Sequence, residues 1–408
     1  MTGIYTITSS LHDEQIVSTS TKVFLDSLNI DFKFRGSDFA EYGSDELNLI
    51  YVRTGGTEGV FRSLLPSLLQ RTTQPVYLLT SGKSNSLAAS MEILSYLRQR
   101  DIQGEIIHGD ADYISQRIQV LSRVEHARRQ LHGCRLGIIG KPSDWLISSA
   151  ADKETVFRRF GISLIDIPMK EVLDTFGALH DVVDIADNTR ECYSELADKA
   201  PTAPIKDSLP GALKIYQALK GIVDKYQLNG LTIRCFDLLT TVRNTGCIAL
   251  AKLNAEGIVA GCEGDVPAML SMMISQSLTG VTGFQANPAR INPETGELLF
   301  AHCTIPFNMV ERYELDTHFE SGIGVGIRGY MKEGPVTIFK VSGNMQRYFA
   351  EEGTLLRNQA EADLCRTQQI IRMDNPSHAR YFLTDPIGNH HIIIPGHHQM
   401  ILEELIRP

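Results

Sequence analysis

The chain has 408 residues, of which 43% are hydrophobic and 21% charged, so we expect a globular protein of two or three domains. Its net charge of −9 and the lack of a Lys/Arg block argue against binding to nucleic acid or to an acidic membrane. The N-terminal residues lack the segments of a secretory signal, and no apolar run is long enough to cross a membrane. The seven cysteines show no CxxC spacing, which predicts reduced, mostly buried thiols in a cytoplasmic protein.

Residues 1–132 are predicted to form an N-terminal α/β domain. Strand-like runs cover 47–53, 76–79 and 105–108, and residues 86–100 carry apolar side chains at helical spacing. This alternation predicts a parallel sheet with helices on its faces. The polar loops 54–59 and 80–85 follow the first two of these strands. We interpret the loop 54–59 either as a contact to sugar hydroxyls or as a plain turn.

Residues 133–282 are predicted to form a second α/β domain. Strands are expected over 134–140, 162–167, 231–236 and 257–261, and helices over 154–160, 208–226, 241–253 and 268–275. The polar stretch 184–204 is expected to be helical in part. The loop after the first strand, residues 141–145, carries the only tryptophan, Trp145.

Residues 283–408 are predicted to form a C-terminal β-rich domain. Short strand-like runs with turn signals replace the earlier alternation, and this spacing indicates an antiparallel sheet or barrel. The expected strands are 297–302, 322–328, 336–341, 368–372, 379–383 and 391–394, followed by a helix over 399–405.

Two glycine-containing segments resemble nucleotide-binding motifs but lack their context. Gly82-Lys-Ser84 resembles the end of a phosphate-binding loop, yet Tyr77 stands where that loop needs its first glycine. The glycines between 322 and 329 alternate with apolar residues, which is a strand pattern without a following helix. We therefore predict no nucleotide site.

Acidic side chains follow two strands of the second domain. Asp237 comes after the strand 231–236, and Glu263 and Asp265 come after 257–261 at a strand-to-helix turn. Ligands bind at this edge of open α/β sheets, and a buried carboxylate needs a compensating charge. His302 and His390 offer imidazoles. Carboxylates with one or two imidazoles suit Mn²⁺ or Mg²⁺ better than a structural zinc site, which favours thiolates.

Each of these residues also has a structural interpretation. Asp237 could cap the helix that follows it, and one of Glu263 and Asp265 could cap the next helix. His302 is either a ligand or substrate contact or a structural histidine.

The C-terminal histidines divide into two pairs. His390 and His391 alternate along a strand, so at most one of them should enter the site. His397 and His398 precede the last helix and are expected to be capping or surface residues.

Three patches carry a resemblance to a known family. They are Arg234-Cys-Phe-Asp237, Cys262-Glu-Gly-Asp-Val266, and Asn389-His390 followed by Pro395-Gly-His397. On these residues the chain resembles the L-fucose isomerase and L-arabinose isomerase superfamily, most closely its fucose-isomerase-related members. The order and spacing of the patches fit over most of the chain.

The resemblance implies a fold, an activity and a metal site. The implied subunit has two Rossmann-like parallel-sheet domains and a β-rich, barrel-like C-terminal domain. The implied activity is that of a Mn²⁺-dependent aldose–ketose isomerase, an intramolecular oxidoreductase, with Mg²⁺ as the alternative ion. The implied metal ligands are Asp237, Asp265 and His390. Asp237 stands where the family has a glutamate, so either the metal or substrate sits differently or Glu263 takes part.

The resemblance also implies a homo-oligomer, a trimer or hexamer, in which the first domain of one subunit covers the active site of another. The partner of the site is then a small-molecule sugar. We assign substrate contacts to Thr57, Glu58 and Ser84 of the N-terminal loops and to His302. Asn389 and His391 are expected to contact the substrate or to orient the ligands.

Moving a carbonyl from C1 to C2 removes a proton beside the carbonyl and returns it to the neighbouring carbon. A divalent ion on adjacent sugar oxygens stabilises the enediolate, and two carboxylates can serve as base and acid. We assign this proton transfer to Asp237 and Asp265, with Glu263 in reserve. The alternatives are a non-catalytic intracellular sugar-binding or sensor protein derived from such an isomerase, and a metal-dependent epimerase or lyase.

Overall fold

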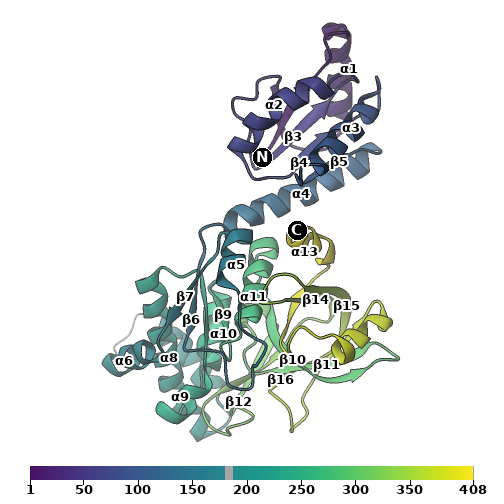
Figure 1. Ribbon diagram of the computed structural model, residues 1–408. Helices are drawn as coiled ribbons and strands as arrows, with labels where there is room; N and C mark the ends of the chain where they lie inside the picture. Colours follow the sequence, from purple (N-terminus) through teal and green to yellow (C-terminus); the bar gives the residue numbers. More distant parts are fainter. Residues whose placement is uncertain (180–186, 408) are drawn as a thin grey trace. The chain divides into compact units, whose positions relative to one another are not determined.

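The computed structural model describes residues 1–179 and 187–407. It divides into two compact units, Met1–Arg129 and Gln130–Pro408, and the boundary falls inside the helix α4 (Ala111–Leu131). Figure 1 draws both units, with colours that follow the sequence from purple at the N-terminus to yellow at the C-terminus. The domain boundaries expected near residues 132 and 282 stay a prediction.

The first unit is built on a five-stranded parallel sheet in the order β2-β1-β3-β4-β5. Every residue of β1, β3 and β4 is buried, as in strands that helices cover on both faces. The parallel sheet predicted here is confirmed, although its first two strands were not predicted. Besides α4, the elements are β1 (Thr2–Ile7), α1 (Glu14–Ser27), β2 (Phe32–Gly36), β3 (Leu47–Val52), α2 (Glu58–Arg71), β4 (Val76–Leu79), α3 (Ser86–Arg98) and β5 (Gly104–Ile107).

The second unit begins with a four-stranded parallel sheet in the order β7-β6-β8-β9, which confirms the second parallel sheet. Its elements are β6 (Arg135–Ile139), α5 (Lys153–Phe160), β7 (Ser163–Ile167), α6 (Met169–Ala178), α7 (Asp187–Lys199), α8 (Ala203–Tyr226), β8 (Gly230–Ile233), α9 (Phe236–Thr241), α10 (Cys247–Ala255), β9 (Val259–Gly261) and α11 (Val266–Thr279). Of the stretch 184–204, expected to be partly helical, residues 184–186 lie outside the described residues.

The second unit continues into a closed six-stranded antiparallel barrel in the order β10-β11-β16-β15-β14-β17, which confirms the barrel-like domain. A two-stranded sheet, β12-β13, is separate from it. The elements are β10 (Phe284–Asn292), β11 (Glu297–His302), β12 (Arg312–Asp316), β13 (Gly326–Tyr330), β14 (Gly334–Val341), β15 (Tyr348–Gln359), β16 (Thr367–Met373), α12 (Tyr381–Thr384), β17 (His391–Pro395) and α13 (Gln399–Ile406), with two 3₁₀ turns, Phe307–Met309 and Pro376–Arg380.

Two strand predictions in this region were wrong. The segment 379–383 belongs to a 3₁₀ turn and to α12, where the ring of Tyr381 stacks on that of Phe349. The strand expected over 322–328 begins only at Gly326, because Gly322 and Gly324 adopt positive φ angles that end the extended conformation. Apolar residues do alternate with glycines over 322–328, but the packing of the folded chain determined which of these residues adopt the strand conformation.

One hydrophobic core joins the barrel to the helices of the parallel sheet. It contains Leu209 and Leu213 of α8, Ile248 of α10, and Phe284 and Ile393 of the barrel. Helix α11 contacts strands of both layers, β8 and β9 of the sheet and β14 and β17 of the barrel. Figure 1 shows α11 between the strand β9 and the barrel strand β14, both of which it contacts. Residues at the end of β9 therefore lie close to residues of the barrel.

Within the part of the chain that the structure describes, no helix combines the length and the apolar character needed to cross a membrane.

Truncation of a leucine in this shared core should destabilise the protein. Leu298 of β11 is 1% exposed, so Leu298→Ala is expected to lower the free energy of unfolding by about 2–5 kcal/mol. Leu383 is 58% exposed and serves as a control. Leu383→Ala should change the free energy of unfolding by no more than about 0.5 kcal/mol. Denaturant unfolding of both variants measures the difference, and equal effects would contradict the placement of β11 in the core.

Candidate metal centre

The turn between β9 and α11 separates two carboxylates. Glu263 has φ +62° and Gly264 has φ +71°, a conformation that glycine adopts without strain. A Cβ on Gly264 would lie 2.6 Å from the carbonyl oxygen of Lys141, so this position has no room for a side chain. The Gly264 N–H donates to the carbonyl of Ile233 at the end of β8 (2.9 Å). The chain reversal directs Glu263 toward a pocket and Asp265 into the interior.

Asp265 is fully buried between α11 and the barrel. It is the N-cap of α11 and accepts a hydrogen bond from the Ala268 N–H (2.8 Å), which confirms the capping alternative for this residue. The Lys340 Nζ of β14 lies 3.3 Å from both carboxylate oxygens, and the His390 Nδ1 lies 2.9 Å from Oδ2. Both carboxylate oxygens of Asp265 are therefore occupied by protein groups.

The charges of this network support one another. Burial alone would raise the pKa of Asp265, but Lys340 and His390 outweigh it and lower that pKa to about 2. Burial alone would lower the pKa of His390, but its hydrogen bond to Asp265 and the nearby negative charge of Glu263 raise that pKa to about 9. Asp265 is thus an anion held between two groups that favour its ionised form.

Three side chains converge where Glu263 faces the imidazoles. Glu263 Oε1 lies 3.5 Å from His390 Nε2 and 3.7 Å from His302 Nε2. One potential ligand atom from each residue lies within 4.8 Å of the others. The second ring nitrogens are engaged elsewhere, His390 Nδ1 with Asp265 and His302 Nδ1 with the Thr304 hydroxyl (2.9 Å). Among the described residues, the buried His390 Nε2 has no hydrogen-bond partner.

The charge states of Glu263 and His302 suit a divalent cation, and His390, whose pKa is raised, would release its Nε2 proton on binding one. Burial opposes ionisation of Glu263, but His302 and His390 outweigh it and hold its pKa below the usual range. Burial lowers the pKa of His302 and so favours the neutral imidazole, which can donate a lone pair. One carboxylate and two imidazoles whose outer nitrogens are oriented by Asp265 and Thr304 form a typical divalent-metal donor set.

A pocket opens beside Glu263 and His302. It also holds Glu320, exposed at the rim, whose pKa is raised by burial and by the charge of Glu263. The pocket is lined by Cys235, Phe236, Leu239, Thr245, Gly246, Cys247, Cys262, Glu263, Asn287, His302, Cys303, Thr304, His318, Glu320 and Cys365. Carboxylates, imidazoles, hydroxyls and an amide therefore share one concave surface with apolar and thiol groups, as in small-molecule sites.

All seven cysteines are free thiols, and five of them line this pocket. The Sγ atoms of Cys235 and Cys262 lie 2.9 Å apart. Burial raises the pKa of Cys247 well above its usual range, so this thiol stays protonated. The absence of CxxC spacing thus agrees with thiols that serve as pocket walls.

The structure places the other predicted ligand, Asp237, apart from this group. Asp237 lies in the first turn of α9, is not its N-cap, and accepts a hydrogen bond from Arg234 Nε (3.0 Å). Its side chain is 39% exposed, and it is absent from the described lining of the pocket. The group of potential ligands therefore consists of Glu263, His302 and His390. Asp265 contacts the other ring nitrogen of His390, Nδ1.

The two neighbours of His390 contact different partners. Asn389 Nδ2 donates to the side-chain oxygen of Asn287, a pocket residue (2.9 Å). His391 is the first residue of β17, and its Nε2 lies 3.0 Å from the Tyr381 hydroxyl, whereas His390 directly precedes the strand.

The remaining predicted substrate contacts belong to the first unit. The buried Thr57 donates its hydroxyl to the Thr54 carbonyl (3.1 Å), and Glu58 begins α2. Ser84 is exposed, and its carbonyl accepts from the Gly55 N–H (2.7 Å), which joins the two polar loops.

A second group of potential metal ligands contains the exposed His397. His397 Nδ1 lies 2.9 Å from Glu352 Oε2, and Glu352 with Asp374 and His397 could also approach an ion. These side chains are at the surface, as expected for His397.

Sequence reasoning missed three residues of this region. Lys340 interrupts an otherwise apolar strand at a position that β pairing buries, which was a usable signal for a buried partner. Trp145 follows β6 at the same edge of the sheet and donates to Glu263. Glu320 lies in a loop whose local sequence carries no comparable signal.

The chain is similar to curated sugar isomerases. The relatives named sulfoquinovose isomerase from Clostridium sp. (strain MSTE9), Alkalicoccus urumqiensis and Priestia megaterium are 24%, 23% and 22% identical over 279, 274 and 274 residues. These matches cover 67%, 65% and 65% of this chain, and the chain spans 60% of the length of the relatives it matches. No family model matches the chain.

Removal of the buried lysine should destabilise the protein. Lys340→Met is expected to lower the free energy of unfolding by about 3–5 kcal/mol, because Asp265 would keep its buried charge with one partner fewer. The exposed Lys332 serves as a control, and Lys332→Met should change the free energy of unfolding by no more than about 0.5 kcal/mol. Denaturant unfolding measures both, and equal stabilities would show that Lys340 is not a required counter-charge.

Proposed function

We propose that this protein is a divalent-metal-dependent aldose–ketose isomerase. The observation that carries the proposal is the convergence of Glu263 Oε1 with the Nε2 atoms of His302 and His390 beside a pocket. The names of the relatives support the same class of reaction, and the resemblance to the L-fucose and L-arabinose isomerase superfamily agrees with it.

The donor set fits a hard or borderline divalent ion. Glu263, His302 and His390 would hold Mn²⁺ or Mg²⁺, and the buried His390 Nε2, without a partner among the described residues, would gain one. Asp265 would act through His390 by accepting its Nδ1–H, which fixes the tautomer that presents Nε2. The bound ion would polarise the sugar oxygens and stabilise the negative charge of the enediolate.

The remaining chemistry belongs to pocket side chains. A proton must leave one sugar carbon and return to its neighbour, so a carboxyl group must face the substrate. Glu320 lines the pocket, and its raised pKa is suited to a group that both takes up and releases a proton. Thr245, Asn287 and Thr304 offer hydrogen bonds for sugar hydroxyls.

Two further parts of the proposal concern the setting of the enzyme. The thiols of the pocket would persist in a cytoplasm, where cysteines stay reduced.

The implied homo-oligomer would allow the N-terminal loops with Thr57, Glu58 and Ser84 to reach a site in another subunit. Light scattering of the purified protein tests the oligomer.

The decisive experiment combines metal analysis with sugar exchange. The purified protein is expected to bind Mn²⁺ and to interconvert an aldose and its ketose in an NMR assay of a sugar panel that includes sulfoquinovose. Glu263→Gln should abolish the exchange and weaken Mn²⁺ binding by more than about 100-fold, because it removes the carboxylate that the imidazoles share. Asp265→Asn should lower metal affinity or turnover by about 10–100-fold through misorientation of His390.

Asp237→Asn separates the two possible ligand sets. It should retain Mn²⁺ binding if Glu263 is the ligand, because Asp237 contacts Arg234. Loss of Mn²⁺ in Asp237→Asn with retention in Glu263→Gln would instead support the ligand set implied by the family resemblance. Tight sugar binding without exchange would overturn the isomerase and support a sugar sensor.

A further inference from the structure

The indole of Trp145 binds the carboxylate at the centre of the candidate site. Its Nε1–H donates to Glu263 Oε2 at 2.7 Å, a short hydrogen bond to a charged acceptor. We propose that Trp145 is a positioning residue that holds Glu263 in the orientation required for metal binding. This inference rests on the proposed function, because it takes Glu263 as a ligand.

The two oxygens of Glu263 have different partners. Oε2 accepts from Trp145, whereas Oε1 faces the Nε2 atoms of His390 and His302 at 3.5 and 3.7 Å. A carboxylate can rotate about its last bond and exchange its oxygens unless a donor selects one of them. The indole N–H makes that selection and leaves Oε1 for the ion.

The loop that carries Trp145 is itself held in place. The Ser143 N–H donates to the carbonyl of Glu263 (2.9 Å), so the loop binds the backbone of the same residue. Arg234 donates to the carbonyl of Pro142 (2.8 Å) and to Asp144 Oδ2 (2.7 Å). These bonds connect the ends of β6, β8 and β9, so the indole is presented from a defined position.

The contacts of Trp145 are those of a positioning group more than of a core residue. Its side chain is 52% exposed, which limits its contribution to hydrophobic stability. Its ring meets that of Phe236 edge to face, with centroids 4.7 Å apart. A phenylalanine at position 145 would keep most of this packing and would lack only the N–H group.

The test uses Trp145→Phe, Glu263→Gln and the double variant in the full-length protein. Isothermal titration with Mn²⁺ should show affinity about 10–100-fold weaker in Trp145→Phe than in the wild type, with an unchanged melting temperature of the metal-free protein. In the Glu263→Gln background, Trp145→Phe should cause no further loss, because the two residues act through one bond. An equal loss in both backgrounds would overturn the positioning role.

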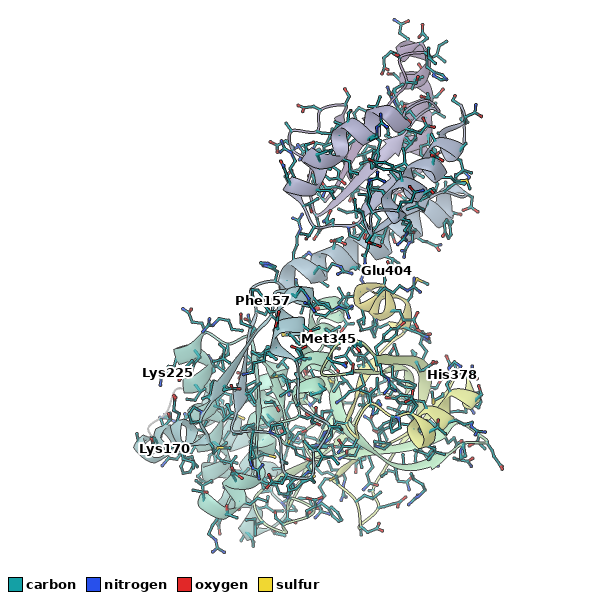
Figure 2. The ribbon with its side chains drawn as sticks, viewed as in Figure 1. Phe157, Lys170, Lys225, Met345, His378 and Glu404 are labelled. Carbon is teal, nitrogen blue, oxygen red and sulfur yellow. The ribbon has the colours of Figure 1, made fainter. Side chains whose placement is uncertain are left out.

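A second readout needs no metal. Trp145 is the only tryptophan, so the protein gives a single indole N–H signal in a ¹H–¹⁵N spectrum. This signal should move in Glu263→Gln and stay in place in the control Phe157→Leu, which alters an exposed aromatic side chain of α5 (Figure 2). An indole signal unmoved by Glu263→Gln would overturn the hydrogen bond on which the inference is built.

The two failures can be told apart. A wild type that binds no divalent cation would overturn the proposed function and the positioning role with it. A wild type that binds Mn²⁺ and loses it in Glu263→Gln, with Trp145→Phe within threefold of the wild type, would overturn the positioning role alone.

Discussion

A buried carboxylate between two structural layers sets the constraint that the second unit must satisfy. Asp265 caps α11, which contacts the parallel sheet, and its charge lies where water cannot compensate it. The barrel supplies the compensation through Lys340 of β14 and through His390, which directly precedes β17. The network therefore ties the sheet to the barrel and orients an imidazole at the same time. Structure and proposed chemistry depend on the same three side chains.

The neighbouring carboxylate has a different environment. Glu263 is two residues from Asp265, but the left-handed turn at Glu263 and Gly264 places it beside the pocket. A left-handed conformation in a residue other than glycine costs free energy, on the order of 1 kcal/mol, and such strain is concentrated at functional sites. Bonds from Ser143 and Gly264 to neighbouring backbone carbonyls stabilise this turn. One acid thus organises the interior while the other faces a ligand.

The similarity to curated isomerases and the geometry of the site address different questions. The relatives are named as isomerases, and they are 22–24% identical to this chain over about two thirds of its length. The geometry indicates which side chains could carry such a reaction here, and it favours Glu263, His302 and His390 over Asp237. The position of Asp237 is consistent with this, because its side chain binds Arg234 and is absent from the described lining of the pocket.

The sequence by itself determined the alternation of strands and helices, the change to a β-rich C-terminal domain, and the position of the acids at the edge of the second sheet. These follow from local periodicity and turn residues, which act over a few positions. Only the tertiary structure decided which acid meets which partner. Lys340, His390 and Trp145 lie 75, 125 and 118 positions from the carboxylates they bind, and sheet order, barrel closure and a left-handed turn bring them together. Pairings at such separations depend on the packing of whole layers, which local sequence patterns do not encode.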